Sequence, residues 1–267
     1  MSSNLGTALI TGASSGIGAV YAERLARRGY DLILVARDAA RLDVTAQRLS
    51  QQSGVMAEAM PTDLTDRDQL AKVEARLLSD TAISLLVNNA GMSLRGTWLT
   101  AEAAEVERLI ALNIIAPTLL ARAAAIAFAA RGEGAIVNIA SVLALTPEMF
   151  DGAYAATKAY LLNLSLSLAA KLGDKGVFTQ AVLPGATRTE IFERSGKDLG
   201  AYPPEWLMEA EDLVDAAMIG FDRRETVTIP PLPDAAQWHA LVDARLAMAP
   251  NLQNRQVGRR YRPAPAP

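Results

Sequence analysis

Tyr154 and Lys158 are the two side chains of this sequence best suited to moving a proton together. They are four residues apart near the start of a long helix predicted from about Asp151 to Leu172, so they share one face of that helix. An ammonium beside a phenol stabilises the phenolate and lowers the phenol pKa from its usual value of about 10, which makes a usable general acid or base. The same spacing also arises by chance in many helices, so only its position in the fold can give the pair a function.

Two further polar residues stand among apolar neighbours. Ser141 closely follows Ala135 to Ile139, an apolar run that predicts a strand, and its hydroxyl could donate to a developing oxyanion. Asn113 interrupts an apolar helical pattern, in which Ala101 to Leu112 and Ala116 to Ala130 predict two helices. Asn113 therefore has two interpretations, a structural cap or kink and a residue that holds a water molecule.

A glycine-rich turn near the N-terminus is a candidate phosphate site. The apolar run from Thr7 to Thr11 predicts a strand, and Ala19 to Arg28 predict a helix that Gly29 ends. The turn between them contains Gly12, Ser14, Ser15, Gly16, Ile17 and Gly18. A helix N-terminus offers unpaired N–H groups and the positive end of a dipole, and glycines let a diphosphate approach the backbone. The spacing Gly-x-x-x-Gly-x-Gly is weak support by itself, because glycine turns between a strand and a helix are frequent.

Strands and helices alternate along the rest of the chain. Apolar runs that predict further strands lie at residues 31–36, 55–60, 83–87, 135–139, 177–183 and 226–229, and helical patterns separate them. This alternation predicts a single α/β domain, a doubly wound parallel sheet of about seven strands with helices on both faces and ligands at the carboxyl ends of the strands. We expect this domain to span residues 1–250, with a substrate loop or lid at 186–210, and a polar, basic tail to follow at 251–267.

Composition and charge narrow the class of protein. The 267 residues are 51% hydrophobic, which suits one large α/β domain, and the net charge of −3 argues against nucleic acid or an anionic membrane as a partner. The absence of cysteine excludes disulfides, thiolate metal sites and thiol nucleophiles, and the single His239 cannot form a His-based metal cluster. The N-terminus lacks a basic leader and no apolar run approaches the ~20 residues of a membrane helix, so we expect a cytoplasmic protein.

The order and spacing of these residues resemble those of the short-chain dehydrogenases/reductases. The matching motifs are Thr11-Gly12-x-x-x-Gly16-x-Gly18, Asp63-Leu64, Asn88-Asn89-Ala90-Gly91, Asn113, Ser141, Tyr154-x-x-x-Lys158 and Pro184-Gly185-x-x-x-Thr189. They extend from Thr7 to about Ile191, and together they are far more specific than any one of them. The resemblance implies a Rossmann-type sheet, a nicotinamide dinucleotide cofactor, an oxidoreductase activity and no metal.

The resemblance also implies roles for the matching residues. Gly12, Gly16, Ile17 and Gly18 would lie at the cofactor phosphates, Asp63 and Leu64 at the adenine, Asn89 and Ala90 at the ribose, and Thr189 at the carboxamide, with Ser14, Ser15, Gly91, Pro184, Gly185 and Thr187 in the same site. Tyr154 would donate a proton to the carbonyl oxygen in reduction or accept it in oxidation. Lys158 would lower the pKa of Tyr154 and bind the ribose hydroxyls. Ser141 would polarise the substrate oxygen, and Asn113 would hold a water that links Lys158 to solvent.

The residue after the second predicted strand bears on the choice between the two nicotinamide cofactors. Dinucleotide folds place an acid about 20 residues beyond the glycines to bind the 2′-hydroxyl of NAD, whereas an arginine there can receive the 2′-phosphate of NADP. Here Ala36 stands where the acid would be and Arg37 follows it, so we expect NADP(H) rather than NAD(H). Asp38 argues the other way, since a shift of one residue would bring its carboxylate near the ribose, and Arg37 could instead be solvated.

The residues expected around the substrate are mostly apolar. Those expected to contact it are Ser141, Leu143, Phe150, Tyr154 and Ile191, with Tyr202 and Trp206 available to close over it. They predict a hydrophobic ketone, aldehyde or secondary alcohol as substrate, unless these side chains pack only against the core and one another. The small side chains of residues 116–130 and the leucines after Tyr154 predict helix-on-helix contacts in a homodimer or homotetramer.

Two other functions stay open at this point. A non-catalytic NADP(H)-binding sensor or scaffold would not need all four of Asn113, Ser141, Tyr154 and Lys158, and their joint presence argues against it. An isomerase or dehydratase that uses the hydride only transiently would need them. The expected partners are a small carbonyl or alcohol and copies of the chain itself, with no nucleic acid and no membrane.

Overall fold

The structure, a computed structural model, describes residues 5–150 and 152–262, and the chain divides into two compact units, Met1–Pro230 and Pro231–Pro267. Position 151, where the sequence predicts the long helix to begin, and residues 263–267 of the predicted tail lie outside the described residues. The predicted site residues all belong to the first unit. The predicted boundary at residue 250 stays a prediction.

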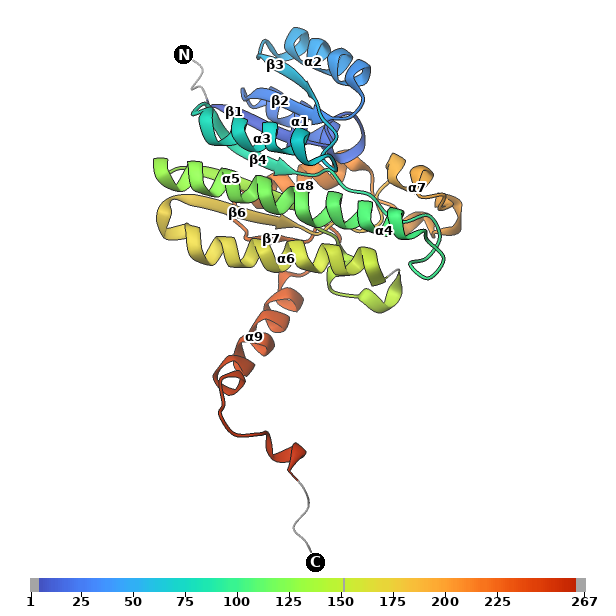
Figure 1. The fold of residues 1–267 in the computed structure, drawn as a ribbon, viewed down its shortest axis with the longest axis vertical. Helices are drawn as coiled ribbons and strands as arrows, with labels where there is room; N and C mark the ends of the chain where they lie inside the picture. The colour runs from blue at the N-terminus through green and yellow to red at the C-terminus, as the bar shows by residue number, and fades with distance from the viewer. Residues whose placement is uncertain (1–4, 151, 263–267) are drawn as a thin grey trace, which may run out of the picture. The chain divides into compact units, whose positions relative to one another are not determined.

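The first unit is built on one parallel sheet (Figure 1). Its described strands are β1 (Thr7–Thr11), β2 (Asp31–Ala36), β3 (Ala57–Pro61), β4 (Ile83–Asn88), β5 (Gly134–Ile139), β6 (Val177–Val182) and β7 (Val227–Thr228). Its described helices are α1 (Gly16–Arg27), α2 (Ala39–Ser53), α3 (Arg67–Ser79), α4 (Ala103–Ile110), α5 (Ala116–Arg131), α6 (Gly152–Leu172), α7 (Glu190–Arg194) and α8 (Ala210–Asp222). The strand order β3-β2-β1-β4-β5-β6-β7 confirms the predicted doubly wound parallel sheet.

Each face of the sheet is covered by its own apolar core. Helices α1, α2 and α8 pack on one face, and α3, α5 and α6 pack on the other. Successive residues of β1 alternate between the two, because Ala8 and Ile10 belong to the first core and Leu9 to the second. Burial on both faces explains why the strands read as unbroken apolar runs.

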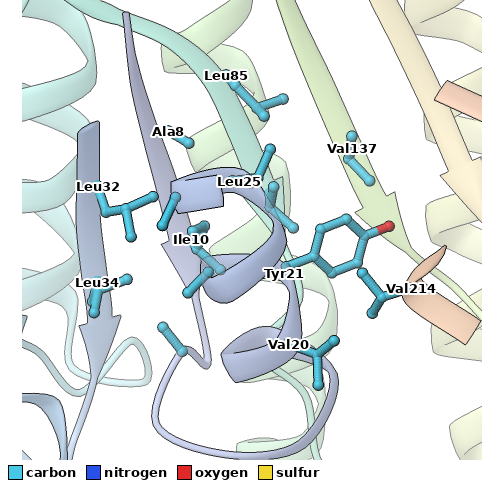
Figure 2. Close-up of a cluster of buried hydrophobic side chains, with 14 of the residues drawn as sticks. Ala8, Ile10, Val20, Tyr21, Leu25, Leu32, Leu34, Leu85, Val137 and Val214 are labelled. Carbon is cyan, nitrogen blue, oxygen red and sulfur yellow. The ribbon is translucent and has the colours of Figure 1, made fainter. Parts of the chain in front are cut away.

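Tyr21 of α1 places its hydroxyl among apolar side chains of the first core, beside Val137 and Val214 (Figure 2). The residue is 1% exposed, and among the described residues its hydroxyl has no hydrogen-bond partner. A buried hydroxyl that gives up its hydrogen bonds to water without replacing them costs free energy on folding.

We therefore expect Tyr21→Phe to raise the free energy of unfolding by about 1 kcal/mol, because it removes the unpaired hydroxyl and keeps the ring. Urea denaturation of the two proteins measures this. Tyr160→Phe is the matched control, since the Tyr160 hydroxyl lies 3.0 Å from Thr118 Oγ1 and its loss should not stabilise the protein. A loss of stability in Tyr21→Phe would contradict the expectation.

The prediction of two helices separated at Asn113 is wrong, because α4 continues through a π turn, Ala111–Ile115, into α5. The Ala116 N–H donates to the carbonyl of Ala111, five residues back. Pro117 has no N–H for the carbonyl of Asn113, so ordinary α-helical bonding is interrupted at this point. Asn113 and Pro117 thus accompany a turn that is wider by one residue, although both residue types suggest a break in the helix.

The joined helix, Ala103–Arg131, is by length and composition apolar enough to cross a membrane, which corrects the expectation that no apolar run approaches that length. Its most apolar window has a mean hydropathy of 1.9, and 44% of that window is buried. Its α5 part packs against α3, β4 and β5. Core helices of soluble proteins share these properties, so the helix is weak support for a membrane span.

The second unit contains one helix among its described residues, α9 (Ala235–Leu252), followed by a short 3-10 turn at Arg259–Tyr261. Asp234 caps α9 by accepting a hydrogen bond of 2.8 Å from the backbone N–H of Ala236. His239 lies within α9 and is exposed. The helix runs two residues into the segment that the sequence predicts as a tail.

Candidate active site

The predicted site residues gather at one edge of the sheet, because the carboxyl ends of parallel strands all point there. β1 pairs with β2 on one side and with β4 on the other, so the strand order reverses at β1 and leaves a crevice in which such folds bind ligands. Each group of predicted residues comes just after the carboxyl end of one strand. The groups are Gly12 to Gly18 after β1, Arg37 after β2, Asp63 and Leu64 after β3, Asn89 to Gly91 after β4, Ser141 and Leu143 after β5, and Pro184 to Thr189 after β6.

Hydrogen bonds join the end of β1, where the glycine turn begins, to the segment that follows β4. The Oγ1 of Thr11 accepts hydrogen bonds of 3.0 Å from the backbone N–H groups of Asn89 and Ala90, and Asn89 Nδ2 donates to the carbonyl of Thr11 at 2.9 Å. A Cβ at Gly18 would lie 2.3 Å from the carbonyl oxygen of Gly12 and 2.4 Å from Asn89 Nδ2. Gly18 is therefore required for packing within the turn.

The first turn of α1 suits an anion. Ser15 is its N-cap residue, yet the Ser15 side chain makes no capping hydrogen bond, and no acidic residue stands in the first turn. The helix therefore starts with N–H groups that no cap side chain satisfies, at the positive end of the helix dipole. This is the environment that a cofactor diphosphate requires.

The ends of β2 and β3 carry charges of opposite sign. Asp38 caps α2 by accepting a 3.0 Å hydrogen bond from the N–H of Arg41, whereas Arg37 is exposed. Partial burial raises the pKa of Asp63, but hydrogen bonds from Thr65 and the charges of Arg37 and Arg108 outweigh it and hold that pKa below its usual value. With Asp38 engaged as a cap, Arg37 is the better placed of the two for a 2′-phosphate.

Asn113 sits fully buried on the π turn and ties three segments together. Its Oδ1 accepts from the N–H of Met92 at 2.9 Å, and its Nδ2 donates to the carbonyl of Met92 at 2.9 Å and to Thr157 Oγ1 at 3.1 Å. A Cβ at Gly91 would lie 3.4 Å from Asn113 Oδ1 and 3.5 Å from Lys158 Nζ. The backbone at Gly91 therefore lies close to both polar groups.

Lys158 is 4% exposed, and its ammonium donates a 2.8 Å hydrogen bond to the carbonyl of Ile139 at the end of β5. Its Nζ lies 5.6 Å from the centre of the Tyr154 ring. Burial lowers the pKa of Lys158 to about 8 and raises the pKa of Tyr154 to about 12. Burial is the cause of both shifts, so the expectation that Lys158 lowers the pKa of Tyr154 stays a prediction.

Ser141 is buried at the end of β5, where its Oγ accepts a 3.2 Å hydrogen bond from the backbone N–H of Leu143. This contact orients the oxygen and leaves its proton available to donate, because within the described residues Ser141 Oγ acts only as an acceptor. The 3-10 turn that Ser141 begins, Val142–Ala144, packs against α6, the helix that carries Tyr154 and Lys158.

Aromatic side chains from two segments, which the sequence predicts near the substrate, pack against one another. The rings of Phe150 and Tyr202 stack with centroids 5.9 Å apart, and Phe192 meets Tyr202 edge-on at 5.4 Å. Phe150 follows β5, whereas Phe192 and Tyr202 belong to the segment between Thr187 and Met208, whose ends pair as an isolated β-bridge. Trp206 remains 56% exposed, and the substrate contact of Ile191, on α7, stays a prediction.

Several residues that shape the site were not among the predicted ones. Thr157 accepts from Asn113, and its place between Tyr154 and Lys158 was the available signal. Glu190 of α7 forms an ion pair with Arg41 of α2, and Arg194 of α7 donates a hydrogen bond to Ser15 of the glycine turn. No local sequence pattern predicts either contact.

Comparison with known proteins gives matches over most of the chain. A family model described as short chain dehydrogenase matches residues 6–200. A solved short-chain dehydrogenase from Sphingobium yanoikuyae, in complex with NADPH, is 53% identical with a TM-score of 0.94, and the match covers 97% of this chain and 100% of that chain. The bulky-bulky ketone specific alcohol dehydrogenase from Comamonas testosteroni is 48% identical with a TM-score of 0.90, covering 98% and 100%.

A curated relative, the very-long-chain 3-oxoacyl-CoA reductase of Bos taurus, is 32% identical over 188 residues. The match covers 69% of this chain and 60% of the bovine protein, so this chain spans less than two thirds of that relative's length.

Proposed function

Because this chain belongs to the short-chain dehydrogenase family, we propose that it transfers hydride between NADP(H) and a bulky hydrophobic ketone or the matching secondary alcohol. The observation that carries the proposal is that Lys158 binds the end of β5, which Ser141 follows, and lies 5.6 Å from the centre of the Tyr154 ring. The uncapped start of α1 follows β1 at the same edge of the sheet. Polar side chains buried at the crevice of a doubly wound sheet are the arrangement that this chemistry needs.

The cofactor phosphates have candidate partners at two places. We assign the diphosphate to the N–H groups at the start of α1 and the 2′-phosphate to Arg37. The solved relative in complex with NADPH, at 53% identity, supports this assignment, as does the engagement of Asp38 in the cap of α2. Thr189 adjoins Gly16, since a Cβ at Gly16 would lie 3.2 Å from Thr189 Cγ2, which places Thr189 beside the proposed diphosphate site. Its expected role at the carboxamide stays a prediction.

The protein's own residues carry the proton. When bound, NADP(H) supplies or accepts the hydride. In reduction, Tyr154 donates its proton to the substrate oxygen and Ser141 donates a hydrogen bond to the same atom. A phenol pKa of about 12 keeps Tyr154 protonated at neutral pH, as a proton donor must be. The Lys158 ammonium, 5.6 Å from the centre of the Tyr154 ring, would stabilise the phenolate that forms. The water that Asn113 would hold stays a prediction.

The aromatic contacts support a large apolar substrate. Phe150, Phe192 and Tyr202 pack against one another, so their rings form one apolar cluster between the loop after β5 and the segment between Thr187 and Met208. The Comamonas testosteroni relative is named for ketones with two bulky substituents, and the match covers its whole chain at 48% identity. We therefore propose ketones with a bulky group on each side of the carbonyl as the substrate class.

The test is NADPH absorbance decay with a graded set of ketones. We expect kcat/KM for diaryl and aryl-alkyl ketones to exceed that for acetone by roughly 10- to 100-fold, because burial of one aromatic ring contributes that much. We also expect a lower KM for NADPH than for NADH.

Each contrary result would overturn a different part of the proposal. Preferred turnover of small polar sugars would overturn the substrate class, and a preference for NADH would overturn the cofactor assignment. Substrate loss with flat NADPH absorbance would indicate an isomerase or dehydratase. Tight NADPH binding without turnover of any ketone would favour a sensor.

A further inference from the structure

The short helix α7 brings a second positive charge to the glycine turn. Arg194 Nη2 lies 3.4 Å from Oγ of Ser15, the N-cap residue of α1. These two residues are 179 positions apart in the chain. Arg194 is not one of the residues that the family motifs single out, and its place is beside the N–H groups to which the diphosphate is assigned.

Glu190 holds Arg194 in this position. The Glu190 carboxylate accepts from Arg194 and accepts two hydrogen bonds from Arg41 of α2, at 2.7 and 3.1 Å. The hydrogen bond from Arg41 and the charges of Arg194 and Arg41 lower the pKa of Glu190 against the effect of burial, so the carboxylate stays charged. The pair Arg41–Glu190 therefore joins α2 to α7 across the glycine turn.

Arg194 shares its acidic partner with Arg41. Among the ion pairs of the described residues, Glu190 is the acidic partner of both arginines. The hydrogen bond and charge of Glu190 raise the pKa of Arg41, and the nearby Asp38 carboxylate also acts on Arg41 and raises this pKa. The first turn of α1 has no acidic residue of its own. A diphosphate bound there would gain charge-assisted hydrogen bonds from the Arg194 guanidinium.

We propose that Arg194, positioned by Glu190, binds the diphosphate of the cofactor and so couples cofactor binding to the position of the substrate segment. The segment between Thr187 and Met208 carries Arg194 together with the aromatic residues Phe192 and Tyr202. A diphosphate held by Arg194 fixes this segment and with it one wall of the substrate region. This inference rests on the proposed NADP(H) site.

The test measures dissociation constants for two probes, NADPH and adenosine 2′-monophosphate, which carries a 2′-phosphate and no diphosphate. We expect Arg194→Gln to weaken NADPH binding at least about tenfold, the usual effect of losing a charge-assisted hydrogen bond, and to change adenosine 2′-monophosphate binding less than about twofold. Arg37→Gln should weaken both probes. Arg188→Gln is the matched control, since Arg188 lies in the same segment but pairs with Glu209 at 2.8 Å.

The variant Glu190→Gln tests whether Glu190 positions Arg194 or only adds a negative charge near the phosphates. If Glu190 only places a negative charge near the phosphates, its removal tightens NADPH binding; if it positions Arg194, its removal weakens NADPH binding, as we expect. Chymotrypsin cleavage at Phe192 and Tyr202 gives the second readout: NADPH should slow it in the natural protein and much less in Arg194→Gln.

Three outcomes would overturn the inference. NADPH affinity unchanged in Arg194→Gln, or equal protection from chymotrypsin in that variant, would overturn it while the proposed function stands. A natural protein that does not bind NADPH at all would overturn both. Thermal unfolding of each variant shows whether a weakened affinity comes from lost structure.

Discussion

Tyr154→Phe is expected to lower kcat for ketone reduction by roughly 10²–10⁴-fold, the usual contribution of a general acid. The variant keeps the ring near Lys158 and removes only the proton that the substrate oxygen would receive. The dissociation constant for NADPH should change little, because the phosphate contacts lie on other elements. Stopped-flow absorbance at saturating NADPH, together with fluorescence titration of NADPH, measures both quantities.

Tyr160→Phe provides the control on the same helix, since its hydroxyl contacts Thr118 on the side of α6 that packs near α5. It should reduce ketones as the natural protein does. If Tyr154→Phe retained more than about a tenth of the rate, a group other than Tyr154 would be the proton donor, because general acid catalysis contributes more than that.

The second large effect is expected at Lys158, whose charge is lost near pH 8. Burial lowers its pKa to about 8, so the ammonium is mostly present at pH 7 and mostly absent at pH 9. Tyr154 keeps its proton throughout this range, because its pKa is raised to about 12. Loss of activity above pH 8 would therefore come from deprotonation of Lys158 and not from loss of the proton of Tyr154.

We expect kcat/KM for NADPH to fall about tenfold per pH unit above about pH 8, since this parameter reports ionisations of the free enzyme. Lys158→Met should lose at least about 100-fold of the activity at pH 7 and show no such fall, because it has no charge to lose. Lys158→Arg keeps a permanent charge, and its residual activity should stay level from pH 7 to pH 9. A fall near pH 8 that persisted in Lys158→Arg would assign it to another group.

The order of elements and the location of the site could be predicted from the sequence because both depend on local patterns. An apolar run buried on both faces identifies a strand of a parallel sheet, and a glycine turn between strand and helix identifies a candidate phosphate site. Since all parallel strands end at one edge, residues as distant as Gly16 and Thr189 could be expected to meet. The structure confirms this, because a Cβ at Gly16 would lie 3.2 Å from Thr189 Cγ2.

What the sequence by itself determined was therefore the parallel sheet, the alternation of strands and helices, and the edge at which the site lies. Only the tertiary structure decided that the helix continues through Asn113, that burial raises the pKa of Tyr154, and that Glu190 pairs with Arg41, 149 positions away. The reason is physical. Helices and strands follow from contacts between near neighbours in the chain, whereas desolvation and ion pairs depend on which distant residues surround a group after the chain has packed.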